Sequence, residues 1–197
     1  NVLVEELRKN KIRIKVHLAS EVFYLPNLTE IANIPFVTFN NKYMLVEFSS
    51  VIFPKNFEEQ FFKLQNSGIN PIIAHPERYR YVKNDVSLIE RWIELGYILQ
   101  LDAGSIIGSF GKKIQEVSFN IIEKYGFHLI GSDAHNNKKR NFCLKDAYSL
   151  LEIKYKKEFV NQLKNNAELL LLGEQLSLSQ VKQKNSLISR FKTKFMK

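Results

Sequence analysis

Residues 56–78, with the sequence NFEEQFFKLQNSGINPIIAHPER, decide the fold class of this 197-residue chain. Asn56 is a suitable N-terminal cap for a helix, the apolar residues that follow recur at helical spacing, and Gly68 is a typical helix terminator. Residues 71–74 then form a short apolar run between turn signals, which is typical of a fully buried strand. A helix followed at once by a buried strand is the repeating unit of α/β proteins.

The same alternation continues toward the C-terminus. We expect a helix from Asp85 to Gly96, a strand over 97–101, a helix over 112–125, a strand over 127–131 and helices over 144–172. On the N-terminal side, alternating apolar residues over 12–18 predict a half-buried strand, and residues 36–48 predict a hairpin around Asn40-Asn41. The chain is therefore predicted to be an α/β protein, with a parallel sheet or barrel covered by helices.

Composition limits the class of protein. The hydrophobic content of 45% and charged content of 25% suit one soluble globular domain, which we place at residues 1–176. A single cysteine, Cys143, excludes an internal disulfide and fits a reducing, cytoplasmic location. Its neighbours supply no phosphate-cradling loop, so we interpret it as a structural residue beside a helix and not as a nucleophile. No apolar run is long enough to span a membrane.

The net charge of +9 is concentrated in the predicted tail, residues 177–197. Residues 181–197 carry six Lys or Arg and no acid, interleaved with apolar side chains. Such a segment would suit a weak contact with anionic lipid or an acidic partner, but a solvated chain end is the commoner behaviour and the one we favour. Because the charge lies in this tail and in scattered lysines, we predict no nucleic-acid partner.

Five chemically suggestive side chains follow predicted strands, and these are Glu21, Glu47, His75, Asp133 and His135. The carboxyl ends of successive parallel strands meet at one edge of an α/β barrel, so we expect these groups to converge. Mixed carboxylate and imidazole ligands suit manganese, iron or zinc better than calcium, whereas magnesium prefers oxygen alone. The sequence therefore predicts a site for paired divalent metal ions, which would need a bridging carboxylate.

Each of these residues also has an ordinary explanation when taken alone. Glu21 resembles a solvated acid at a strand end, His75 a turn residue before proline, and Asp133 a turn cap. Glu47 is harder to explain, because an acid within an apolar run is unfavourable unless it is paired or binds a metal. Only the joint pattern favours a metal site.

Two arginines follow the predicted ligands. Arg78 lies three residues after His75, and Arg140 lies five residues after His135. Planar guanidinium groups bind phosphate with two hydrogen bonds and stabilise charge on a transferring phosphoryl group. An exposed surface arginine is the alternative, especially for Arg140, which follows Lys138-Lys139. We interpret Glu77 as a residue that orients Arg78.

At these residues the sequence resembles the polymerase and histidinol phosphatase (PHP) superfamily, and more closely the bacterial capsule-type, CpsB/CapC-like tyrosine phosphatases. The matching segments are residues 19–24, 45–48, 73–79, 100–101, 108–111, 132–135 and 165–170, in the order of the family. Together they cover nearly all of residues 1–176. The resemblance implies a distorted (β/α)7 barrel, similar to a TIM barrel, that binds up to three metal ions, usually Mn²⁺.

The resemblance also implies roles for individual residues. Glu21 matches a carboxylate that bridges metals, Glu47 and His75 match ligands of one metal, and Asp133 and His135 match ligands that complete the others. Arg78 and Arg140 match the two arginines that hold phosphate. The implied activity is hydrolysis of phosphotyrosine on the tail of a bacterial tyrosine kinase that controls capsular or exopolysaccharide synthesis, without a phosphocysteine intermediate.

The chain departs from the family at its beginning. The family starts with a strand that bears His-x-His, and no such motif is present here. Residues 2–10 have the pattern of the last turns of a helix with no N-cap before them, and the chain does not begin with Met. We therefore expect an N-terminally incomplete barrel that supplies part of the metal site.

Two alternatives stay open at this point. One is another PHP phosphoesterase, of the histidinol-phosphatase or nuclease type. The other is an inactive, truncated PHP module that only binds the kinase tail. The oligomeric state is left open by the sequence.

Overall fold

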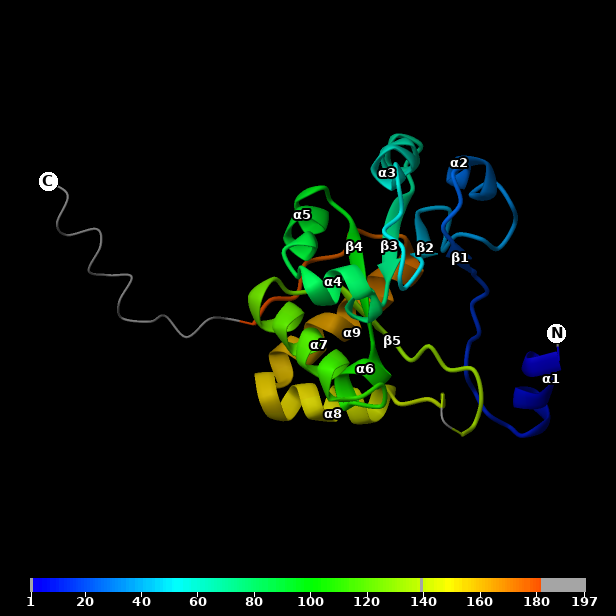
Figure 1. Cartoon of the computed structure of the whole chain (residues 1–197). Coiled ribbons are helices and arrows are strands. Elements are labelled where there is room, and N and C mark those ends of the chain that lie inside the picture. Colours follow the sequence, from blue (N-terminus) through cyan, green and yellow to red (C-terminus); the bar gives the residue numbers. More distant parts are fainter. Residues whose placement is uncertain (1, 139, 182–197) are drawn as a thin grey trace, which may run out of the picture.

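The protein is built on a five-stranded sheet in which every strand is parallel to its neighbours (Figure 1). The computed structural model describes residues 2–138 and 140–181. The strands are β1 (Glu21–Phe23), β2 (Tyr43–Glu47), β3 (Asn70–Ala74), β4 (Ile98–Asp102) and β5 (Leu129–Gly131). Their spatial order, β1-β2-β3-β4-β5, is also their order along the chain. The predicted α/β class with a parallel sheet is therefore confirmed.

Helical segments connect the strands. They are α1 (Val2–Lys9), α2 (Leu28–Ile31), α3 (Phe57–Asn66), the 3-10 turn η1 (Pro76–Arg78), α4 (Arg80–Asn84), α5 (Leu88–Glu94), α6 (Ala103–Ile107), α7 (Lys112–Lys124), α8 (Leu144–Tyr155) and α9 (Lys157–Leu172). The long helices and the strands β3, β4 and β5 agree with the sequence prediction to within a few residues. The short segments η1, α4 and α6 were not predicted, because they are too short to show a helical period.

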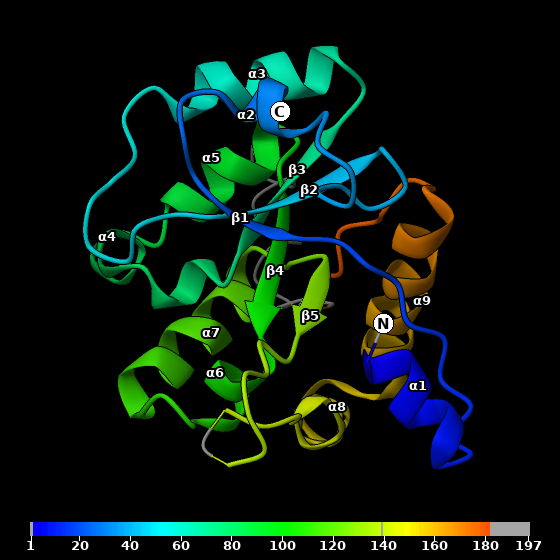
Figure 2. The same ribbon diagram turned by 90° about the vertical axis from the view of Figure 1, so that its right-hand side faces the viewer.

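The two faces of the sheet are covered unequally. Alternate strand residues such as Met44, Ile73 and Leu99 belong to a large core that contains the buried sides of α3, α5, α7, α8 and α9. The residues between them, such as Leu45 and Ile72, form a much smaller cluster on the opposite face. Figure 2 looks toward the sheet from the side on which α1 stands. Period-two alternation along each strand produces this division.

The strand predicted over residues 12–18 does not form. This segment is extended but outside the sheet, and its apolar side chains are exposed, with Ile14 at 65% and Leu18 at 63%. Figure 1 shows α1 standing away from the sheet at the end of this segment. Alternation predicts that a segment is able to pair, but pairing needs a neighbouring strand, and none of the described strands lies beside 12–18. The sheet begins instead at Glu21.

The predicted hairpin is reduced to one bridge, between Phe39 and Tyr43. Asn40 and Asn41 make the turn with positive φ angles of 49° and 53°, a backbone region that asparagine tolerates. The turn prediction is therefore confirmed, but the first arm is not a strand. The reason is that β2 already has parallel partners on both sides, β1 and β3, which leaves no free edge.

The end of the described chain lies against the sheet domain. Ser179 bridges Phe127 through two backbone hydrogen bonds, and the side-chain amide of Asn166 donates to the carbonyl of Ser177. Residues 182–197 lie outside the described residues, so the basic tail stays a prediction. Among the described helices, none combines the length and the hydropathy needed to cross a membrane.

Candidate functional site

Two glutamates share one face of the sheet, with Glu21 at the start of β1 and Glu47 at the end of β2. In the register of β1 and β2, Glu21 lies opposite Leu45 and Phe23 lies opposite Glu47. Register partners in a sheet point to the same side, and so do residues two apart on one strand. Glu21 and Glu47 therefore project from the sparsely covered face, the face on which Leu45 packs.

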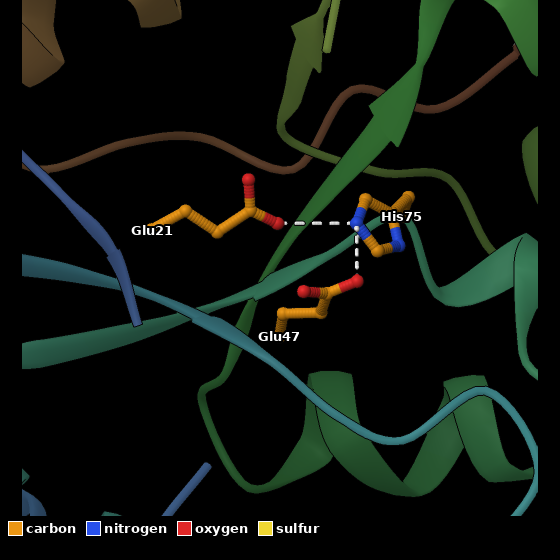
Figure 3. Close-up of side chains that lie close together, drawn as sticks. All are labelled: Glu21, Glu47 and His75. Carbon is orange, nitrogen blue, oxygen red and sulfur yellow. Dashed lines mark hydrogen bonds and ion pairs between the residues drawn. The ribbon is translucent and has the colours of Figure 1, made fainter. Parts of the chain in front are cut away.

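His75 completes a cluster with these two carboxylates (Figure 3). Its Nε2 lies 3.1 Å from Oε1 of Glu21 and 3.5 Å from Oε1 of Glu47, and the three ligand atoms lie within 4.8 Å of one another. The residue is 5% exposed and follows β3 directly, with its backbone N–H donating to the carbonyl of Gln100 at 2.7 Å. Two carboxylates and an imidazole at this spacing are a suitable ligand set for a first-row divalent cation.

The backbone of His75 is strained. Its φ of 32° lies at the edge of the left-handed region, which is unfavourable for a residue with a side chain. The strand and the turn η1 hold it on either side. Strain of this kind persists where the surrounding structure enforces it, and it is concentrated at functional sites.

The charge state of His75 reflects its neighbours. Burial lowers its pKa, but the hydrogen bond with Glu21 and the nearby Glu77 carboxyl together raise the pKa above its ordinary value. The acidic groups thus outweigh the effect of burial. An environment that favours a positive charge on an imidazole is also one that attracts a cation.

Tyr79 fixes the ends of β2 and β3 relative to each other. Its hydroxyl donates to the carbonyl of Ala74 at 2.7 Å and accepts from the backbone N–H of Phe48 at 2.9 Å. These two groups adjoin His75 and Glu47 in the chain. Because Tyr79 is fully buried, this bridge is shielded from water and keeps the two ligands in register.

A second cluster forms around Asp133, in the loop after β5. Arg78 Nη1 lies 2.6 Å from Asp133 Oδ2, and Arg140 also pairs with this oxygen. Burial raises the pKa of Asp133, but the hydrogen bond from Arg78 and the charge of Arg140 lower it below its usual value overall. Asp133 also has a positive φ, 45°. The two predicted phosphate-binding arginines therefore meet at one carboxylate.

His135 lies beside this cluster, and one of its ring nitrogens is engaged in a hydrogen bond. Its Nδ1 lies 2.9 Å from the backbone carbonyl of Asp133, so Nδ1 must carry the proton that is donated. In the neutral ring this leaves Nε2 with a free lone pair, the form in which histidine binds a metal. The carbonyl of Arg140 accepts the backbone N–H groups of His135 and Asn136, which closes the loop.

The structure thus divides the five predicted ligands into two groups. Glu21, Glu47 and His75 form the only cluster of metal-ligand spacing within residues 2–138 and 140–181. Asp133 and His135 lie with the arginines, and Arg78 connects the two groups, because it follows His75 in η1 and reaches Asp133.

Two acidic residues of this network were not predicted as site residues. Asp102 ends β4 and is almost fully buried, with Oδ2 3.3 Å from Arg78 Nη1 and Oδ1 accepting from the backbone N–H of Gly104 at 2.6 Å. Glu77 is fully buried and accepts from the backbone N–H of Asp102 at 3.1 Å. The strand-end rule that selected Asp133 would also have selected Asp102.

Glu77 and Asp102 are both harder to ionise than usual. Burial raises the pKa of Glu77 to about 7, and burial also raises the pKa of Asp102 although Gly104 and Arg78 oppose it. Glu77 accepts a hydrogen bond from the backbone of Asp102, whose side chain pairs with Arg78, so Glu77 helps to position the strand end beside that arginine.

Cys143 lies at the start of α8 and is partly buried. Burial raises the pKa of its thiol, as do the neighbouring carboxylates Asp102 and Asp146. The thiol therefore stays protonated near neutral pH, which fits the structural role predicted for it.

Comparison with known proteins gives a consistent result. Residues 1–172 match the family described as capsular polysaccharide synthesis, CpsB/CapC. The chain is 39% identical over 135 residues to the tyrosine-protein phosphatase YwqE of Bacillus subtilis (strain 168), a match that covers 68% of this chain and 53% of YwqE. It is 26% identical over 171 residues to the tyrosine-protein phosphatase CpsB of Streptococcus agalactiae, covering 83% of this chain and 70% of CpsB.

The fold is also similar to a solved structure. A crystal structure from work on YwqE of Bacillus subtilis and CpsB of Streptococcus pneumoniae, described as metal-dependent tyrosine phosphatases, superimposes with a TM-score of 0.83 at 33% sequence identity. The superposition covers 93% of this chain and 76% of that one. This chain thus spans about half of YwqE in the sequence match and three quarters of the solved chain in the structural match.

Proposed function

Because this chain belongs to the CpsB/CapC family, we propose that it is a metal-dependent protein-tyrosine phosphatase. The observation that carries the proposal is the Glu21–Glu47–His75 cluster, with its ligand atoms within 4.8 Å, beside two arginines that meet at Asp133. The substrate class is the phosphotyrosine monoester. The proposed partner is the phosphotyrosine tail of a bacterial tyrosine kinase that controls capsular or exopolysaccharide synthesis.

We assign the metal ligands as follows. Glu21, Glu47 and His75 would hold one divalent ion, and Glu21, Asp133 and His135 would contribute ligands to a further ion. The mixed oxygen and nitrogen set supports Mn²⁺, and iron or zinc would also fit. When bound, such ions would make a water molecule acidic enough to act as the nucleophile near neutral pH.

The arginines bind the phosphoryl group in this proposal. Arg78 and Arg140 both reach the same carboxylate oxygen of Asp133, so their guanidinium groups converge on one small region. Two converging guanidinium groups suit the oxygens of a phosphate monoester and stabilise the charge that spreads over them during transfer. A tyrosine phenol has a pKa of about 10, so it leaves with little help from an acid.

We also propose that the sheet is part of a distorted (β/α)7 barrel. Each strand pairs with the next strand in the chain, without the reversal of order found in doubly wound sheets. The helices crowd one face of the sheet, as they do around a barrel. We also propose a cytoplasmic location, because the single cysteine of the chain fits a reducing compartment.

The test is hydrolysis of a phosphotyrosine peptide by the purified, Mn²⁺-loaded chain. We expect turnover that a chelator abolishes and that added Mn²⁺ restores, with loss of activity in Asp133→Ala. Turnover that survives chelation, or full activity in Asp133→Ala, would contradict the proposed function.

Parallel assays separate the alternatives. Faster hydrolysis of histidinol phosphate or of single-stranded DNA than of phosphotyrosine would indicate a different phosphoesterase. Binding of the phosphopeptide with no turnover, and with no more than one metal ion per chain, would indicate an inactive binding module.

A further inference from the structure

A pocket of about 210 Å³ opens next to the arginine cluster. Its walls come from the segment after β4, which includes Gly104 and Phe110, and from the loop after β5, which includes Asp133, Arg140 and Phe142. The pocket therefore combines one of the proposed phosphate-binding arginines with two aromatic rings. An apolar cavity of about 150 Å³ is sufficient to hold benzene, so this volume accommodates a phenyl ring.

Phe110 is a fixed wall of this pocket. The guanidinium carbon of Arg78 lies 4.8 Å from the centre of its ring, a cation–π contact. Within the same segment, a Cβ added to Gly104 would lie 2.9 Å from Cε2 of Phe110, so the ring needs a glycine at this position. Phe110 thus links the pocket to the same arginine that pairs with Asp133.

Phe142 is the aromatic residue of the pocket whose side chain is exposed to solvent. It is 80% exposed, although it lines the pocket, and it forms no aromatic pair with any residue that the structure describes. A large apolar side chain held in water at the rim of a polar site contributes little to the core. Its exposure is explained if a ligand covers it.

The charges of the pocket suit an ester whose phosphate lies at one end. Asp133 is paired with both arginines, and Asp102 is paired with Arg78, so these two acids are compensated. The other charged residues that line the pocket are one base, Lys138, and one acid, Asp146. Arg140 also has a buried Nε that makes no hydrogen bond to any described residue. Arg140, which lines the pocket together with Phe110 and Phe142, thus keeps one N–H donor that has no described partner.

We propose that this pocket is an aryl subsite, in which Phe142 and Phe110 contact the phenyl ring of the substrate while Arg140 holds its phosphate. The inference rests on the proposed function and adds to it a preference for an aromatic phosphomonoester over an aliphatic one. Aromatic pairs add favourable energy beyond the area that they bury, which corresponds to about a 3- to 10-fold gain in affinity for each good contact.

The test measures binding of two non-hydrolysable probes, phenylphosphonate and methylphosphonate, to the Mn²⁺-loaded chain by calorimetry. We expect the wild type to bind phenylphosphonate about 10-fold more tightly than methylphosphonate. Phe142→Ala should lose most of this preference by weakening phenylphosphonate alone. Phe62→Ala, which truncates a phenylalanine of 61% exposure on α3, is the matched control and should keep the preference.

A preference that is absent in the wild type, or that survives unchanged in Phe142→Ala, would overturn the aryl subsite. Phe110→Leu gives a second reading, because it should weaken phenylphosphonate binding even if Phe142→Ala folds poorly. Failure of the proposed function is distinguishable: no turnover of a phosphotyrosine peptide, together with a preference that depends on Phe142, would reject the phosphatase and retain the pocket.

Discussion

Two buried histidines show how differently the two edges of the sheet are built. His75 follows β3 at the carboxyl edge and is 5% exposed, whereas His128 precedes β5 at the amino edge and is 8% exposed. The pKa of His75 is raised, and the pKa of His128 is lowered to about 4. The two residues share type and burial, so burial does not account for the difference.

The neighbours of each ring account for it. His128 Nδ1 accepts the backbone N–H of Leu99 at 3.2 Å, and no carboxylate contributes to its pKa, which burial alone lowers. His75 faces Glu21 and Glu47. The amino edge therefore holds a neutral histidine as a structural acceptor, and the carboxyl edge gathers acids around a histidine that is available to a cation. The same division between a stabilising and a functional edge is found in α/β barrels.

The largest expected effect comes from removing the histidine at the carboxyl edge. His75→Ala should lower kcat/KM on a phosphotyrosine peptide by about 1000-fold, because a bound ion stabilises the transition state by several kcal/mol. Metal content, measured by mass spectrometry, should fall by at least one ion per chain. His17→Ala, which truncates an exposed histidine outside the sheet, is the control and should change neither quantity. Unchanged metal content in His75→Ala would remove His75 from the metal site.

The next largest effect concerns the amino edge and its dependence on pH. The folded pKa of His128 is about 4, below an unfolded value of about 6.5, so the unfolded chain binds the proton first as pH falls. His128 therefore contributes stability that is present above pH 6.5 and lost progressively toward pH 4, by about 3 kcal/mol at most. His128→Asn keeps an acceptor for Leu99 but does not titrate.

Urea unfolding of the wild type and of His128→Asn between pH 7 and pH 4 measures the contribution of His128 to the free energy of unfolding. Relative to His128→Asn, the wild type should lose stability as the pH falls. Glu77, whose pKa is raised to about 7, acts in the opposite direction by destabilising the folded state as pH rises from about 4.5, but it does so in both proteins and cancels in the difference. Parallel pH profiles would contradict the structural role of His128.

The third effect separates the arginines from the metal ligands at the carboxyl edge. Arg140→Lys keeps the charge but loses the planar pair of donors, so kcat/KM should fall by about 100-fold while metal content stays the same. Arg91→Lys is the control, since Arg91 pairs with Glu58 at the surface of α5 and should leave activity unchanged. Loss of metal in Arg140→Lys would show that this arginine also supports metal binding.

The smallest effect tests the link that holds the ligands in register. Tyr79→Phe leaves the buried backbone groups of Phe48 and Ala74 without their hydroxyl partner, which should destabilise the fold by about 2 kcal/mol. Tyr81→Phe is a matched control, because the Tyr81 hydroxyl is buried and has no hydrogen-bond partner among the described residues. Thermal unfolding should show a lower midpoint for Tyr79→Phe than for Tyr81→Phe. Equal midpoints would show that the Tyr79 hydrogen bonds do not stabilise the fold.

Much of the candidate site was predictable because strand ends in parallel sheets share one edge. That rule placed Glu47 and His75 together, and the structure brings their ligand atoms and that of Glu21 within 4.8 Å of one another. For Glu21 the rule was wrong, because the strand expected over 12–18 does not form and Glu21 begins β1 instead of following a strand. The rule did not reveal that Asp133 would pair with both arginines, because the course of the loop after β5 depends on charges that lie far apart in the sequence.

The amino-acid sequence by itself determined the α/β alternation, the strand ends and the types of ligand, since these depend on local periodicity and side-chain chemistry. Only the tertiary structure decided which alternating segments are strands. Residues 12–18 have a strand pattern but no pairing partner among the described residues, whereas Glu21–Phe23 pairs with β2. The tertiary structure also decided the opposite environments of His75 and His128. Hydrogen bonds between strands and the approach of distant charges are properties of the folded chain, and no local pattern encodes them.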